Sequence, residues 1–144
     1  MSCYRVTAGA VPAEDVVQSV DHLHGDPVPR LVGDARRFIA GLTPAVSDDL
    51  RDVLLLLSSE LVTNAVIHAR TSIEVGLTVT DRSIVVTVHD EDLGRAEVPG
   101  AVPREGGWGL GLVGQLSAAH DMERHPGEGK TAWFRLARDD QGDA

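Results

Sequence analysis

Residues 58–69 read SSELVTNAVIHA, a stretch in which polar side chains are evenly spaced within an apolar helix pattern. Glu60, Asn64 and His68 recur every fourth residue, so on a helix they lie on one side. The amide oxygen of Asn64 is a hard ligand that suits Mg²⁺, and the Glu60 carboxylate can orient or deprotonate an attacking hydroxyl. Taken alone, this spacing is better explained as an ordinary polar stripe on an amphipathic helix.

This stretch ends the second of two predicted helices. The first covers residues 29–42, where apolar residues recur at helical spacing, and Gly41 and Pro44 end it. Ser47 is a good N-cap for the second helix, which is predicted to run to about Ala69. Its predicted buried side consists of Leu50, Val53, Leu54, Leu57, Leu61, Ala65 and Ile67.

Two strands follow the helices, and then a long loop, a third helix and a closing hairpin. The first strand alternates apolar and polar residues, the pattern of a half-buried strand, whereas the second is nearly all apolar, as in a central strand. Because the first two predicted helices precede the strands in the chain, the sequence predicts an α+β sandwich, with helices on one face of a mixed, largely antiparallel sheet. The predicted ranges are 73–79 and 84–88 for the strands, 91–108 for the loop, about 110–119 for the helix, and 121–125 with 131–137 for the hairpin.

The chain has 144 residues, a length that suits one domain. We place that domain at residues 31–138, after an N-terminal extension of residues 1–30 and before a disordered tail at residues 139–144. The extension is expected to hold at most one edge strand, around residues 3–7. The pattern of residues 11–23 is ambiguous.

Composition argues against several classes of function. The chain has 13 basic and 22 acidic residues and a net charge of −9, which repels nucleic-acid phosphates. A single cysteine cannot form an internal disulfide, and there is no signal peptide or apolar run long enough to span a membrane. We therefore expect a soluble, cytoplasmic protein with no direct nucleic-acid or membrane partner.

Two further motifs contain residue types that suit contacts with a nucleotide. Asp90 directly follows the apolar strand, where its carboxylate can accept a hydrogen bond from an exocyclic amine or can simply form a turn. Residues 106–114 read GGWGLGLVG and lead into the third helix. Glycines of this kind let backbone N–H groups approach a phosphate.

Three other patterns are rejected. Residues 109–114 match GxGxxG, but the dinucleotide fingerprint needs a strand just before it. Residues 127–131 read GEGKT and resemble the end of a P-loop, but Arg124 stands where an earlier glycine is needed and a strand follows. His22 and His24 form an H-x-H pair, but no carboxylate or thiol is suitably spaced to finish a metal site, so no zinc site is predicted.

The order of the helix motif, Asp90, the glycine cluster and the final G-K-T resembles the GHKL ATP-binding fold, a Bergerat-type two-layer sandwich. The closest likeness is to bacterial anti-sigma-factor serine/threonine kinases and their actinobacterial relatives. The resemblance covers roughly residues 34–136, and its most specific parts are SSELVTNAVIHA and GWGLGLV. It implies that the chain binds ATP together with Mg²⁺.

The resemblance also implies a role for each matching residue. Glu60 matches the proposed general base, Asn64 the Mg²⁺ ligand and Asp90 the residue that binds adenine. Thr131 matches a threonine beside the adenine, and Arg104 lies in the matching ATP lid, where it could meet a phosphate. The other implied nucleotide contacts are Gly94 in the first glycine box, and Gly107, Gly109, Leu110 and Gly111 in the second.

The function that the resemblance favours is a regulatory protein kinase. It would transfer the γ-phosphoryl group of ATP to a serine or threonine of an antagonist protein and would sequester a sigma factor. Relatives of this kind are often dimers, so a homodimer is expected.

Two alternatives stay open. Asp92 replaces a glycine of the first glycine box and adds negative charge near the nucleotide, which favours an ATP-sensing, partner-binding module without phosphotransfer. A histidine-kinase catalytic domain is disfavoured. Such a domain normally follows a helical dimerisation segment, and residues 1–30 are too short and too broken to form one.

Overall fold

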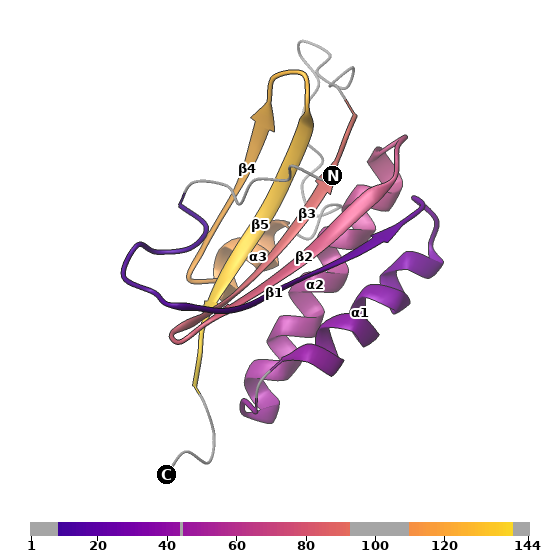
Figure 1. Cartoon of the computed structure of the whole chain (residues 1–144). Helices are drawn as coiled ribbons and strands as arrows, with labels where there is room; N and C mark the ends of the chain where they lie inside the picture. The colour runs from indigo at the N-terminus through magenta and orange to yellow at the C-terminus, as the bar shows by residue number, and fades with distance from the viewer. Residues whose placement is uncertain (1–8, 44, 93–109, 140–144) are drawn as a thin grey trace.

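The computed structural model describes residues 9–43, 45–92 and 110–139, which form a two-layer sandwich of a sheet and helices. The five strands pair in the order β1-β2-β3-β5-β4, and each of these pairings is antiparallel. Figure 1 shows α1 and α2 side by side on one face of the sheet. The predicted α+β fold is confirmed. The elements are β1 (Val17–Gly25), α1 (Arg30–Leu42), α2 (Asp48–His68), β2 (Ile73–Thr80), β3 (Ser83–Asp90), α3 (Leu110–Leu116), β4 (Ala119–His125) and β5 (Gly129–Ala137).

Helix α2 begins where the sequence predicts. The Ser47 hydroxyl accepts a hydrogen bond from the Leu50 N–H over 3.0 Å, and Asp48 and Asp49 stand in the first turn. Both features favour the positive end of a helix. The Ser47 hydroxyl also donates to the Asp139 carboxylate over 2.7 Å, so the chain just beyond β5 is joined to the start of α2. Of the predicted tail, residues 140–144 lie outside the described part of the chain.

One side of α2 packs into the main core. Ile67 was predicted to belong to this side, but its exposed fraction is 63%. It lies about 140° round the helix axis from Leu54, because successive residues are about 100° apart. Spacing along the sequence therefore overestimated the width of the apolar face. The buried residues of α2 are Leu54, Leu57, Ser58, Leu61 and Val62.

The sheet separates two apolar clusters. The larger one lies under the helices, and the smaller one lies on the outer face, where Ala10 packs with Val85 and Trp133. All eight residues of β2 are buried, so the half-buried pattern predicted for residues 73–79 is wrong. β2 lies between β1 and β3, and neighbouring strands cover it on both edges.

The ends of the chain differ from the prediction in two places. Strand β1 comes from the segment whose pattern was ambiguous and lies at one edge of the sheet. The strand expected around residues 3–7 lies outside the described residues. Helix α3 ends three residues before the predicted end, because the Ala118 N–H already donates to the Arg135 carbonyl oxygen of β5 over 2.8 Å. None of the described helices is long and apolar enough to cross a membrane.

Candidate functional site

The flank of α2 that carries Glu60 and Asn64 faces away from α1. The Arg36 guanidinium of α1 donates to the Leu55 carbonyl oxygen over 3.3 Å and to the Ser59 hydroxyl over 2.8 Å. Helix α1 therefore lies along the opposite flank of α2, the one that carries Leu55 and Ser59. Glu60 lies about 140°, and Asn64 about 180°, round the helix from Leu55. Figure 1 shows α3 on this other side of α2, and the two helices are in contact.

Asn64 carries an unsatisfied polar atom on this flank. Its side-chain oxygen Oδ1 is buried and has no hydrogen-bond partner among the residues that the structure describes. A buried acceptor without a partner costs about 1–3 kcal/mol. A divalent cation, or water bound to one, would satisfy this oxygen, since amide oxygens are ligands that Mg²⁺ accepts. The residues present therefore fit a Mg²⁺-bound nucleotide beside Asn64.

Asp90 lies at the same end of the sandwich as the C-terminal half of α2. It pairs with Ile73 across the β2–β3 ladder, and a short connection joins Ile73 to His68, the last residue of α2. Alternate residues of a strand face opposite sides. Val88 belongs to the core under the helices, so Asp90, two residues on, also faces the helix layer. The structure thus brings Asn64 and Asp90 to one end of one layer.

Asp90 is buried, with 3% of its surface exposed, and its carboxylate already has two partners. Its Oδ2 atom lies 3.2 Å from Lys130 Nζ, and its Oδ1 atom accepts a hydrogen bond from the Asp92 N–H over 2.9 Å. The hydrogen bond from the Asp92 N–H is the contact expected of a turn-forming aspartate, which was the alternative role for Asp90 in the sequence. The ion pair with Lys130 was not predicted, because it depends on the β3–β5 register that places these two residues opposite each other.

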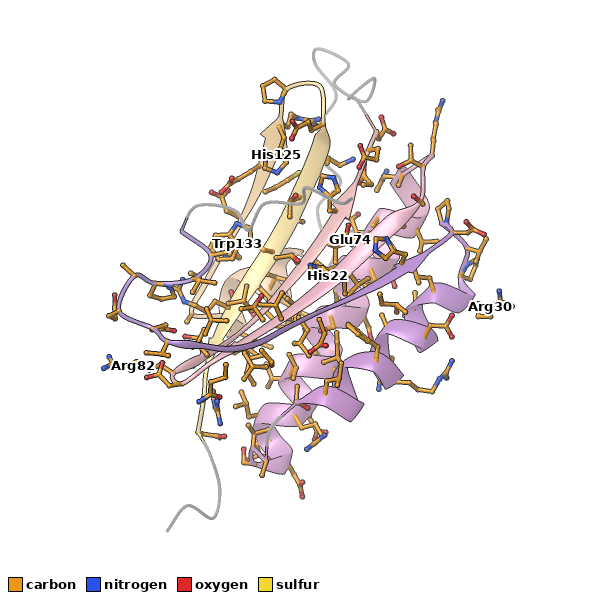
Figure 2. The ribbon with its side chains drawn as sticks, viewed as in Figure 1. His22, Arg30, Glu74, Arg82, His125 and Trp133 are labelled. Carbon is orange, nitrogen blue, oxygen red and sulfur yellow. The ribbon has the colours of Figure 1, made fainter. Side chains whose placement is uncertain are left out.

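Thr131 does not lie beside Asp90, contrary to the expectation that both would meet one adenine. Thr131 pairs with His89, and both side chains point to the outer face of the sheet. The Thr131 hydroxyl lies 2.8 Å from His89 Nδ1 and 3.0 Å from His125 Nε2. Figure 2 labels His125 on the β4–β5 hairpin. The reason is strand alternation: Lys130, not Thr131, shares the face of Asp90.

The glycine-rich candidates are described only in part. Gly94, Arg104, Gly107 and Gly109 lie outside the described residues, and Leu110 opens α3. Gly111 is exposed in the first turn of this helix, with open space where a side chain would be. The phosphate contacts expected of these residues remain predictions.

The sequence model of the histidine kinase-like ATPase domain matches residues 27–136 of the chain. The chain therefore belongs to this GHKL-type family, and membership implies that it binds ATP. A comparison with curated proteins found no match.

Proposed function

We propose that this protein is a regulatory serine/threonine protein kinase that uses ATP and Mg²⁺. The kinase would phosphorylate an antagonist protein. It would itself be a homodimer in the cytoplasm and would sequester a sigma factor there. The observation that carries the proposal is the pair Glu60 and Asn64 on the flank of α2 away from α1. The buried Asn64 oxygen there has no hydrogen-bond partner among the described residues.

Each polar group has a distinct part in this proposal. Asn64 would hold the metal ion that accompanies ATP, and a bound Mg²⁺ would neutralise charge on the phosphates. The substrate hydroxyl oxygen bonds to the γ-phosphorus while the bond to the β-phosphate oxygen breaks, and ADP leaves. Glu60 accepts the proton of that hydroxyl, so the attacking oxygen carries no extra charge into the product. Glu60 is half-buried on α2, which leaves one side open to a substrate.

Glu60→Gln is expected to abolish transfer while leaving ATP binding within about twofold of the wild type. Glutamine keeps the shape and a hydrogen-bonding oxygen but cannot act as a base at neutral pH. General-base catalysis is worth about 10²–10⁴-fold in rate. The measurement is transfer of labelled phosphate from ATP to a partner co-purified from the native host.

Glu128→Gln is the matched control, because Glu128 is an exposed glutamate in the turn between β4 and β5 and does not belong to α2. This variant should transfer phosphate at the wild-type rate. Equal transfer by Glu60→Gln and the wild type would remove Glu60 from the mechanism. No transfer by the wild type to a verified partner would rule out the kinase proposal.

A second function is supported by the surroundings of Asp90. Its carboxylate is held by Lys130 and by the Asp92 N–H, so adenine would have to share or displace these partners. Such competition favours weak, concentration-dependent ATP binding. Weak, concentration-dependent ATP binding is sufficient for an ATP-sensing module that binds a partner protein without phosphotransfer.

We expect ATP to bind at least about tenfold more tightly than GTP, and Asp90→Asn to reduce this preference. An ionised carboxylate only accepts hydrogen bonds, and it would meet the exocyclic amine of adenine but the carbonyl oxygen of guanine. An unsatisfied buried acceptor costs about 1–3 kcal/mol, and 1.4 kcal/mol is one decade in affinity. The asparagine amide can rotate to donate to guanine. Competition binding with both nucleotides measures the ratio.

Lys130→Met is the control for this experiment. It removes the ion pair but keeps the Asp90 carboxylate, so the preference for ATP should remain. If Asp90 serves only the turn through the Asp92 N–H, Asp90→Asn will change thermal stability and leave the ATP-to-GTP ratio untouched. That outcome would contradict the adenine assignment.

A further inference from the structure

The chain leaves the sheet at Glu91, directly after the last paired residue of β3. In both ladders of β3 the final pair contains Asp90, which lies opposite Ile73 of β2 and opposite Lys130 of β5. Glu91 belongs to neither ladder, so other contacts set the direction in which the chain continues. That direction matters, because the Asp92 N–H in the same turn contacts the Asp90 carboxylate at the proposed adenine site.

A threonine side chain takes the place of the next ladder bond. The Thr71 hydroxyl accepts a hydrogen bond from the Glu91 N–H over 2.9 Å, across a separation of 20 residues in the chain. The same hydroxyl donates to the Ser72 carbonyl oxygen over 3.1 Å, so its single proton is engaged and its lone pairs are left to accept. Thr71 is thus oriented as an acceptor for the Glu91 N–H.

The next backbone N–H along the chain orients the Asp90 carboxylate. The χ2 torsion of an aspartate has only a broad intrinsic preference, so its contacts decide where the two oxygens point. Oδ1 accepts from the Asp92 N–H over 2.9 Å, and Oδ2 lies 3.2 Å from Lys130 Nζ. A lysine ammonium on its flexible stem can follow a rotating carboxylate, whereas a backbone N–H in a fixed turn cannot. The Asp92 N–H therefore fixes the direction of the carboxylate lone pairs.

Thr71 also links the two parts of the proposed nucleotide site. It lies three residues after His68, the end of α2, and this helix carries Asn64. The hydrogen bond to Glu91 therefore joins the segment that follows α2 to the turn that follows β3. A turn that is already ordered costs less conformational entropy on binding than one that the ligand must order.

The turn is confined from the side of β5 as well. A Cβ atom at Gly129 would overlap the Asp90 carbonyl oxygen and the backbone of Glu91. Because β2 and β5 lie on opposite edges of β3, Gly129 and Thr71 hold the Glu91 backbone from two sides. The Glu91 carboxylate also lies 3.3 Å from His89 Nε2, but its side chain is 62% exposed, so water competes for that contact.

We propose that Thr71 is a positioning residue of the nucleotide site, because it fixes the turn that orients the Asp90 carboxylate toward adenine. Thr71 holds the Glu91 N–H, and the following Asp92 N–H holds the carboxylate. This inference rests on the proposed adenine contact of Asp90. The sequence contained no signal for it, since the hydrogen bond joins two connections that are 20 residues apart.

The test compares Thr71→Val with Thr71→Ser. Valine keeps the branched shape and loses the hydroxyl, whereas serine keeps the hydroxyl. Thr71→Val should reduce the ratio of ATP affinity to GTP affinity about fivefold, which is what one ordinary hydrogen bond is worth, and Thr71→Ser should keep the wild-type ratio. Competition binding to the full chain measures the ratio. A purely structural role would lower the thermal stability of the valine variant and leave the ratio unchanged.

A second measurement needs no nucleotide. Backbone amide hydrogen exchange, followed by NMR, should become about fivefold faster at Glu91 and Asp92 in the Thr71→Val variant, because the turn loses one hydrogen bond. Ser72→Ala is the matched control, since it removes the neighbouring exposed hydroxyl and keeps the carbonyl oxygen that Thr71 contacts. This control should match the wild type in both measurements.

The two measurements separate the possible failures. Unchanged exchange at Asp92 in the Thr71→Val variant would overturn the positioning role, and so would an unchanged ratio of ATP to GTP affinity. A wild type that binds no ATP would contradict the proposed function itself. The exchange rates would then still decide whether Thr71 fixes the turn.

Discussion

Asn64→Ala is expected to weaken ATP binding at least about tenfold in the presence of Mg²⁺. The substitution removes the buried amide oxygen that has no hydrogen-bond partner among the described residues. Contacts to charged groups are worth about 1.5–3 kcal/mol, and 1.4 kcal/mol is one decade in affinity. Calorimetry with ATP measures the loss. Without Mg²⁺, the difference between wild type and variant should largely disappear, because the metal ion is what Asn64 would hold.

Ser58→Ala provides a matched control on the same helix. The Ser58 hydroxyl is also buried without a hydrogen-bond partner among the described residues, but it lies on the core side of α2. ATP affinity should be unchanged in this variant. Equal affinities of the Asn64→Ala variant and the wild type with Mg²⁺ would rule out the metal assignment. A wild type that binds no ATP at millimolar concentration would contradict the nucleotide site as a whole.

Gly129→Ala is expected to destabilise the protein by about 2–5 kcal/mol. Gly129 has a φ of +88°, a left-handed conformation that costs a residue with a Cβ about 1–2 kcal/mol. A Cβ atom there would also overlap the Asp90 carbonyl oxygen and the backbone of Glu91. Overpacking of this kind costs about 1–3 kcal/mol more. Urea denaturation measures the change in the free energy of unfolding.

Gly127→Ala separates the two causes. Gly127 has a φ of +75° in the same turn, but nothing lies within 4 Å of the position its Cβ would take. This variant should lose only the conformational part, about 1–2 kcal/mol. If both alanine variants lose the same stability, the close approach of Gly129 to Asp90 makes no contribution of its own.

Much of the fold could be predicted from the sequence because its signals are local. The Ser47 cap and the helical spacing of leucines identify α2 within a few residues of its ends. An apolar run followed by Asp90 likewise predicts β3, and the structure ends that strand at Asp90. The positions of Glu60 and Asn64 on one helix flank also follow from spacing alone.

What could not be predicted depends on strand register, which no local pattern specifies. The register of the strands brings the Lys130 side chain next to the Asp90 carboxylate and turns Thr131 to the outer face of the sheet. It also brings the Glu74 carboxylate close to both His22 and His24. A shift of one residue would exchange every one of these neighbours, because successive side chains point to opposite faces. A motif such as G-K-T names residue types but not the face on which each of them lies.

The order of strands also has a consequence for how the chain folds. β2 pairs with β3, and β4 with β5, as neighbours in sequence, whereas β3 pairs with β5 across a separation of 40 residues between Asp90 and Lys130. Closing such a long loop costs conformational entropy before any contact forms, so non-local pairings slow folding. The two hairpins are therefore expected to form first, and the β3–β5 seam later. Because Asp90 meets Lys130 only when β3 pairs with β5, a partly folded chain would lack this ion pair at the proposed adenine site.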